Sequence, residues 1–190
     1  MTEEQATDIL LASYKAEVAF RHRTFTDKEQ TEKYCKRLAS LLTAEDGKFG
    51  IMLCGICGNG KTTMLYAFQS AMNWLSDIGA FGRERKGIRI VDAKEVAGYT
   101  NELKSFGEIR TCPMLGIEDM GREPSEIVDY GNVLNPMIDL LEYRYNMQLF
   151  TFITTNLRAN EVRAKYGDRI ADRFNEMLDV IIFGNTTYRK

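Results

Sequence analysis

The apolar positions of this chain follow two patterns, short continuous runs and longer stretches in which apolar residues recur every three or four positions. Short runs predict buried strands, whereas the longer stretches predict amphipathic helices. The predicted strands are residues 49–54, 88–92, 113–117, 149–155 and 178–183. The predicted helices are residues 1–23, 26–47, 64–78, 93–108, 127–145 and 160–177. This alternation predicts an α/β fold with about five mainly parallel strands and helices on both faces.

Two local signals refine the helix boundaries. Thr26 and Glu29 match a capping box, which predicts that the second helix begins there. Pro136 lies inside the predicted helix at 127–145, and proline lacks the N–H that continues the helical hydrogen-bond ladder. We therefore expect either a kink or a break near Asn135.

The composition fits one globular domain. With 190 residues, 44% of them hydrophobic, the chain is long enough for one α/β core of ordinary size. Its net charge of −2 excludes a molecule that is basic over its whole surface, so a nucleic-acid contact would need a local patch. No apolar run reaches the roughly 18 residues of a membrane span, and the acidic start is not typical of a signal peptide. We expect a cytoplasmic protein without a membrane partner, whose four cysteines are thiols.

A glycine-rich segment between the first predicted strand and its helix matches the phosphate-binding pattern G-x-x-x-x-G-K-[ST]. In this pattern backbone amides converge on nucleotide phosphates, the lysine contacts the β and γ oxygens, and the threonine hydroxyl binds Mg²⁺. The predicted nucleotide-binding residues are Gly55, Gly58, Asn59, Gly60, Lys61, Thr62 and Thr63. ATP and Mg²⁺ are the expected cofactors. Cys54 and Cys57 match half of a zinc or redox motif, but no second pair follows, which favours ordinary thiols.

Polar side chains also follow two other predicted strands. Glu118 and Asp119 come directly after the strand at 113–117. In P-loop NTPases one acid at this place binds Mg²⁺ through water and another polarises the attacking water. An ordinary acidic turn is the alternative, and the phosphate-binding pattern upstream disfavours it. Asn156 follows the strand at 149–155, where it is either a residue that holds the hydrolytic water or a plain turn asparagine.

Taken together, segments 49–63, 113–121, 149–157 and 167–189 resemble the AAA+ ATPases of the DnaC/IstB type, which are bacterial replicative helicase loaders and transposition helper ATPases. The resemblance covers most of the chain after residue 25. Its most specific motifs are Gly58–Thr62, Glu118–Gly121, Glu142–Tyr145, Ile153–Leu157, Asp168–Phe174 and Thr187–Arg189. Each motif is weak alone, but their order and spacing are specific. The resemblance implies a three-layer αβα domain of the AAA+ type without a C-terminal helical lid.

The resemblance also implies roles within one subunit. Lys61 and Thr62 would bind phosphate and Mg²⁺. Glu118 and Asp119 would be the Walker B pair, the first nearer the metal and the second polarising water. Asn156 would be the sensor I residue. Family members mostly carry aspartate first in the Walker B pair, so the order Glu then Asp implies slow hydrolysis.

Between subunits, the resemblance implies an arginine finger that acts on the ATP of a neighbour. Arg173 matches this residue best, and Arg169 is the alternative. A finger supplied by a neighbour ties hydrolysis to assembly, so a homo-oligomer is expected. Residues 1–25 form an N-terminal helical extension of the AAA+ domain at 26–190, and this short extension leaves the helicase partner open.

We therefore expect a protein that binds and hydrolyses ATP, self-associates, and acts on DNA in replication, by helicase loading, or in transposition. Its expected partners are a second copy, single-stranded DNA, and a replicative helicase or a transposase. A nucleotide-gated binding module that does not hydrolyse ATP is one alternative. A small-molecule P-loop kinase is another, disfavoured because the chain shows no arginine-rich lid or acceptor site. The cations at 83–89 are more typical of a solvated loop than of a DNA contact.

Overall fold

The computed structural model describes residues 1–99, 103–129 and 132–184. Its helices are α1 (Glu3–Phe20), α2 (Lys28–Thr43), α3 (Lys61–Asp77), α4 (Ala93–Tyr99), α5 (Leu103–Thr111), α6 (Pro136–Asn146) and α7 (Ala159–Met177). Its strands are β1 (Gly50–Gly55), β2 (Arg89–Asp92), β3 (Met114–Met120), β4 (Ile127–Asp129), β5 (Asn132–Leu134), β6 (Phe150–Thr155) and β7 (Asp179–Phe183). The family-like motif at 187–189 lies outside the described residues.

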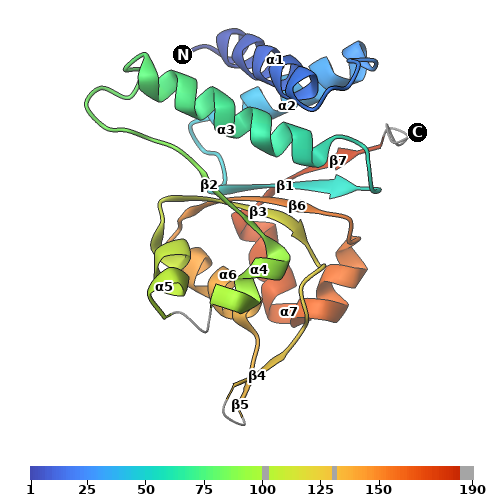
Figure 1. Cartoon of the computed structure of the whole chain (residues 1–190), viewed down its shortest axis with the longest axis vertical. Coiled ribbons are helices and arrows are strands. Elements are labelled where there is room, and N and C mark those ends of the chain that lie inside the picture. The colour runs from blue at the N-terminus through green and yellow to red at the C-terminus, as the bar shows by residue number, and fades with distance from the viewer. Residues whose placement is uncertain (100–102, 130–131, 185–190) are drawn as a thin grey trace.

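The centre of the molecule is a parallel sheet with the strand order β2-β3-β6-β1-β7. Helices α1, α2 and α3 cover one face, and α4 to α7 cover the other (Figure 1). These three layers confirm the predicted αβα architecture and its five parallel strands. Because the strands are parallel, the carboxyl ends of β1, β3 and β6 lie at one edge of the sheet, where α/β proteins bind ligands.

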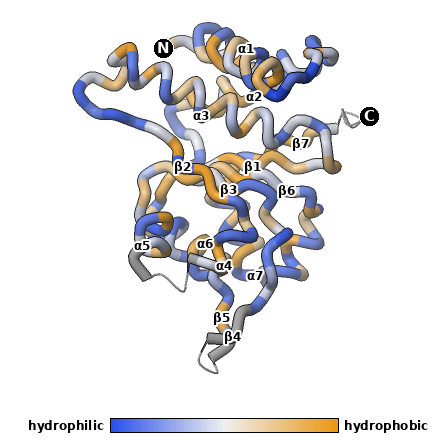
Figure 2. The backbone as a smooth tube through the Cα atoms, viewed as in Figure 1, coloured by the Kyte–Doolittle hydropathy of each residue, from blue (hydrophilic) through white to orange (hydrophobic). Residues whose placement is uncertain are grey.

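Each face of the sheet has its own apolar core, and apolar positions gather along the strands between the helix layers (Figure 2). On one face, α1 contributes Ala6, Leu10, Tyr14 and Val18 to the core that α2 and α3 share. On the other face, Phe174 and Met177 of α7 pack with Ile153 of β6. Because α1 is part of the first core, the segment that follows it is held close to the start of α3.

Residues 127–134 differ from the prediction. The predicted single helix over 127–145 is wrong, because β4 and β5 pair as an antiparallel hairpin that projects away from the sheet (Figure 1). The helical part, α6, begins at Pro136, and Ile138 N–H donates to Asn135 Oδ1 over 3.2 Å. The predicted break at Asn135 is therefore confirmed. Proline suits the first helical position, where its missing N–H would have no partner in the helix.

Other boundaries also shift. The capping box at Thr26 is wrong, because α2 begins at Lys28 and the side chain of Asp27 makes no capping hydrogen bond. The predicted helix at 93–108 is described as α4 and α5, on either side of residues outside the described ranges. Helix α7 is kinked at Gly167, whose φ of 84° favours glycine. Over the described ranges, no helix has the length and apolar character needed to span a membrane.

Candidate nucleotide-binding site

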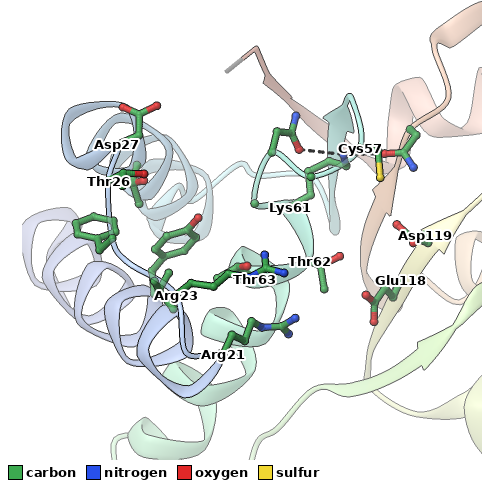
Figure 3. A pocket seen from close by; sticks show the side chains of 18 of the residues that line it. Arg21, Arg23, Thr26, Asp27, Cys57, Lys61, Thr62, Thr63, Glu118 and Asp119 are labelled. Atoms are coloured by element: carbon green, nitrogen blue, oxygen red, sulfur yellow. Dashed lines mark hydrogen bonds between the residues drawn. The ribbon is translucent and has the colours of Figure 1, made fainter. Parts of the chain in front are cut away.

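A cavity of about 450 Å³ lies where the carboxyl edge of the sheet faces the segment after α1 (Figure 3). It is lined by most of the residues predicted to act within one subunit. These are Gly58, Asn59, Gly60, Lys61, Thr62, Thr63, Glu118, Asp119 and Asn156. The structure thus brings the glycine-rich loop, the acidic pair and the asparagine to one place, although they are far apart in the sequence.

The glycine-rich loop joins β1 to α3, as the pattern predicts. Gly55, Gly58 and Gly60 have φ values of 151°, 83° and 94°, a region that disfavours other residues. A Cβ on Gly55 would lie 2.4 Å from the carbonyl oxygen of Phe183, so the close approach of β7 also requires glycine there. Because α3 begins at Lys61, the N–H groups of its first turn, which have no partner within the helix, are at the loop.

Lys61 is 4% exposed, and its ammonium is surrounded by oxygen atoms. It donates to the carbonyl oxygens of Gly55 and Ile56 over 2.7 and 2.8 Å. It also lies 3.0 Å from Asn59 Oδ1 and 2.9 Å from Asn156 Oδ1. These four oxygens are uncharged and outnumber the three protons of the ammonium. A phosphate oxygen can therefore replace one of them, with a gain in charge attraction.

The two asparagines connect the loop to neighbouring strands. Asn59 donates through Nδ2 to the carbonyl oxygen of Phe183 at the end of β7, over 2.8 Å. Asn156 lies directly after β6, which is hydrogen-bonded to β1 on one side and β3 on the other. Asn156 is thus between the glycine-rich loop and the acidic pair, the position that a water-holding residue needs.

The acidic pair lies at an irregular end of β3. The register between β3 and β6 shifts between Ile117 and Met120, and Asp119 has a φ of 54°. The N–H of Asp119 donates to Thr154 Oγ1 over 2.9 Å, and Asp119 Oδ2 lies 2.6 Å from Arg122 Nη1. Aspartate adopts this left-handed conformation more readily than most residues, and the irregular strand end changes the direction of the side chains that follow it.

Glu118 faces the cavity opposite Thr62 (Figure 3). The hydroxyl of Tyr66, one helical turn after Thr62 on α3, donates to Glu118 Oε2 over 3.1 Å. Burial and the adjacent Glu118 carboxylate raise the pKa of Tyr66, so its hydroxyl keeps its proton at neutral pH.

Several cavity residues were missed from the sequence. Arg21 and Arg23 extend into the cavity from the segment after α1 (Figure 3), and residues 24–27 complete that wall. Asp92, at the end of β2 in register with Glu118, and Arg122 line the cavity as well. Arginines are common at the C-terminal end of a helix, so the sequence does not indicate that Arg21 and Arg23 reach the cavity. Only the packing of α1 against α3 places them there.

The loop after the acidic pair is attached to α7 by a buried cluster that the sequence does not indicate. Glu123 is 4% exposed and accepts a hydrogen bond from Gly121 N–H over 2.8 Å and another from the Tyr166 hydroxyl. Lys165 donates to the carbonyl oxygens of Gly121 and Glu123 over 2.9 and 2.6 Å. These contacts fix the turn that follows Asp119.

The two candidate finger residues lie on α7, outside the residues that line the cavity. Both contact Glu142 Oε1, Arg169 through Nε at 3.2 Å and Arg173 through Nη1 at 2.9 Å. The Arg173 side chain is only 14% exposed and stacks on Tyr145, whereas that of Arg169 is 71% exposed. Exposure therefore favours Arg169 for a contact with another subunit.

The cysteines and the basic loop at 83–89, the other candidate functional residues, show fewer features of a binding or catalytic site. None of the four cysteines, all of which lie within the described residues, forms a disulfide, and burial raises the pKa of Cys54 to about 11. The basic loop at 83–89 lies at the end of α3 away from the cavity (Figure 1). Arg85 pairs with Asp77 at 3.2 Å, and Arg89 pairs with Glu108 at 3.5 Å. This local pairing lowers the charge that the loop offers to a phosphate backbone.

Comparison with known proteins identifies the fold. No protein-family model matches the sequence, and neither does any curated protein. The DnaC helicase loader matches with a TM-score of 0.61 and 19% identity, covering 84% of this chain and 93% of that chain. DnaI also matches with a TM-score of 0.61, at 21% identity, covering 87% of this chain and 86% of that chain.

AMPPCP-bound DnaA from Aquifex aeolicus matches with a TM-score of 0.55 and 17% identity, covering 83% of this chain and 48% of that chain. These similarities agree with the resemblance read from the sequence motifs. The chain has the P-loop fold of DnaC-like AAA+ proteins.

Proposed function

We propose that this protein binds ATP with Mg²⁺ in the 450 Å³ cavity and hydrolyses it as a DnaC-like AAA+ ATPase of DNA replication. The observation that carries the proposal is the meeting of Lys61, the Glu118–Asp119 pair and Asn156 around one cavity. Each comes from the carboxyl end of a different strand or the loop after it. A cation, two carboxylates and a neutral amide at such an edge are what phosphoryl transfer to water requires.

Within this site each side chain has a distinct task. Lys61 and the N–H groups at the start of α3 bind the phosphates. Thr62 and Glu118 offer hydroxyl and carboxylate oxygens, the ligand types that Mg²⁺ prefers, and Mg²⁺ when bound neutralises phosphate charge. Asp119, held by Thr154, polarises the attacking water, and Asn156 orients it.

The wall after α1 supports binding of the nucleoside part. Thr24, Phe25 and Thr26 line the cavity, with Thr26 on the side opposite the acidic pair (Figure 3). The ring of Phe25 packs edge-on against Tyr14, with 6.1 Å between the ring centroids. An apolar ring with polar neighbours suits an adenine base and its ribose. We assign this wall to the base because the loop and the acidic pair already account for the phosphates.

The proposal includes assembly and partners. A second copy would supply Arg169 or Arg173 to the γ-phosphate, so that turnover depends on contact between subunits. Single-stranded DNA and a replicative helicase are the proposed partners, with a transposase as the counterpart if the protein acts in transposition. Support comes from the similarity in fold to the DnaC helicase loader and to DnaA.

The test is ATP turnover per subunit, measured against protein concentration with and without single-stranded DNA. We expect turnover to rise with concentration or with DNA, and Lys61→Ala to abolish it. Arg83→Ala, in the loop at the far end of α3, is the control and should turn over like the wild type. Turnover at background under every condition would contradict the ATPase.

A nucleotide-gated binding module is the second candidate function. It is favoured by the ion pair between Arg122 Nη1 and Asp119 Oδ2, 2.6 Å apart, which engages the carboxylate proposed to polarise water. Tight ATP binding without release of phosphate, in the same experiment, would support this module over the ATPase.

A further inference from the structure

Helix α1 is connected to Glu118, the carboxylate proposed to bind Mg²⁺, through the side chains of Arg21 and Tyr66. Arg21, directly after α1, lies with its Cζ atom 5.1 Å from the ring centroid of Tyr66. The hydroxyl of Tyr66 donates to Glu118 Oε2 over 3.1 Å. Arg21 is in turn held by Glu17 of α1, with 2.6 Å between Nε and Oε1. A chain of side-chain contacts therefore runs from Glu17 of α1 through Arg21 and Tyr66 to the Glu118 carboxylate of β3.

Tyr66 is placed so that its hydroxyl contacts Glu118 without entering the cavity. Tyr66 follows Thr62 by four residues on α3, so the two side chains lie on the same helix face. Thr62 and Glu118 line the cavity, whereas Tyr66 does not, so it touches the acid from behind. A hydrogen bond to one oxygen of a ligating carboxylate fixes its direction and leaves the other oxygen for the metal.

The chemistry of the donor also matters. The Tyr66 hydroxyl is neutral, so it orients Glu118 without cancelling the negative charge that Mg²⁺ needs. The guanidinium of Arg21 lies against the Tyr66 ring. The carboxylate of Glu17 forms an ion pair with this guanidinium and partly offsets its positive charge. A cation on an aromatic face is attracted to the ring and so helps to hold that ring in place.

From these contacts we propose that Tyr66 is a positioning residue that directs Glu118 toward Mg²⁺, and that Arg21 fixes Tyr66 from α1. This inference rests on the proposed nucleotide site. It gives α1 a part in metal binding, because displacement of Arg21 would free the tyrosine ring and, with it, the carboxylate.

The test measures Mg²⁺ affinity directly. A fluorescent ATP analogue is bound to the full chain, Mg²⁺ is titrated, and nucleotide affinity is measured separately in EDTA. Tyr66→Phe removes only the hydroxyl and should weaken apparent Mg²⁺ affinity by about 10-fold, the lower end of the cost of losing a partner to a metal ligand. Nucleotide affinity in EDTA should stay unchanged. Arg21→Met should shift Mg²⁺ affinity in the same direction by a smaller factor.

Two controls separate positioning from general damage. Tyr143→Phe removes a hydroxyl from α6, where the ring contacts Arg110 at 4.0 Å on the other face of the sheet, and should leave Mg²⁺ affinity unchanged. In a Glu118→Gln background, Tyr66→Phe should have no further effect, because the oriented carboxylate is gone.

The possible outcomes distinguish a failure of the Tyr66 proposal from a failure of the proposed nucleotide site. If the wild type binds no nucleotide at any Mg²⁺ concentration, both the site and the inference fail. If the wild type binds Mg²⁺ and nucleotide, and Tyr66→Phe binds both equally well, only the inference fails. An equal loss caused by Tyr66→Phe in the wild-type and Glu118→Gln backgrounds would also overturn it.

Discussion

The ammonium of Lys61 donates a hydrogen bond to Asn156 Oδ1 over 2.9 Å and so joins the start of α3 to the end of β6. This contact follows from the sheet, because β1 and β6 pair in parallel and their carboxyl ends are neighbours. The lysine and the asparagine can therefore act on the same group. The amide NH₂ of Asn156 can then donate to water while its oxygen faces Lys61.

We expect Asn156→Ala to reduce ATP hydrolysis far more than ATP binding. The amide is proposed to orient the attacking water, and loss of one preorganised polar group costs about 10²-fold in rate. Single-turnover hydrolysis and the ATP dissociation constant, measured side by side, check this. Asn160→Ala, which changes an exposed asparagine on α7 outside the cavity lining, is the control. Equal hydrolysis by the two variants would contradict the proposed role.

Substitution of Arg169 should mainly affect ATP hydrolysis, whereas substitution of Arg173 should mainly affect stability. Arg169→Ala should remove assembly-dependent hydrolysis with little change in melting temperature, because its side chain is 71% exposed and exposed ion pairs contribute little. Arg173→Ala should lower the free energy of unfolding by about 1–3 kcal/mol, since the Tyr145 ring loses the guanidinium packed against it and Glu142 keeps only the exposed Arg169. Thermal unfolding and turnover of each variant decide between them. Loss of stability in Arg169→Ala alone would reverse our assignment.

Cysteine alkylation should report nucleotide binding. Cys57 is exposed and lines the cavity, so its thiol should react with iodoacetamide before the others. Burial raises the pKa of Cys54 to about 11 and that of Cys35 to about 12, which keeps both protonated and unreactive at pH 8. Peptide mass spectrometry should show slower modification of Cys57 with Mg²⁺ and ATP. An unchanged rate at saturating nucleotide would argue against binding at this loop.

Arg144 should be a purely structural residue. It is fully buried, and its guanidinium donates to the carbonyl oxygens of Cys112 and Phe150 over 2.9 and 2.6 Å. Arg144→Met would leave these oxygens without a donor, so we expect a loss of at least about 3 kcal/mol in the free energy of unfolding by urea. Arg83→Met, in the exposed loop, should cost almost nothing. A wild-type urea midpoint for Arg144→Met would show that other groups satisfy these carbonyls.

Much of the fold could be predicted because its strands are short apolar runs and its long helices are strongly periodic. Lys61 and the acidic pair could be placed together because parallel strands bring their carboxyl ends to one edge. The strands β4 and β5 could not be predicted, because Ile127, Val128 and Val133 fit a strand as well as they fit helical spacing. Arg21 reaches the site through the packing of α1 on α3, and Tyr66 reaches Glu118 through the packing of α3 beside β3. No local sequence pattern encodes either contact.

The central claim is that the cavity binds ATP through Lys61. Its most direct test is equilibrium binding of a fluorescent ATP analogue, with Mg²⁺ present, to the wild type and to folded Lys61→Ala. We predict saturable binding by the wild type and at least tenfold weaker binding by the variant, a difference of about 1.4 kcal/mol. Equal affinity of the two proteins, or no binding by the wild type, would contradict the account.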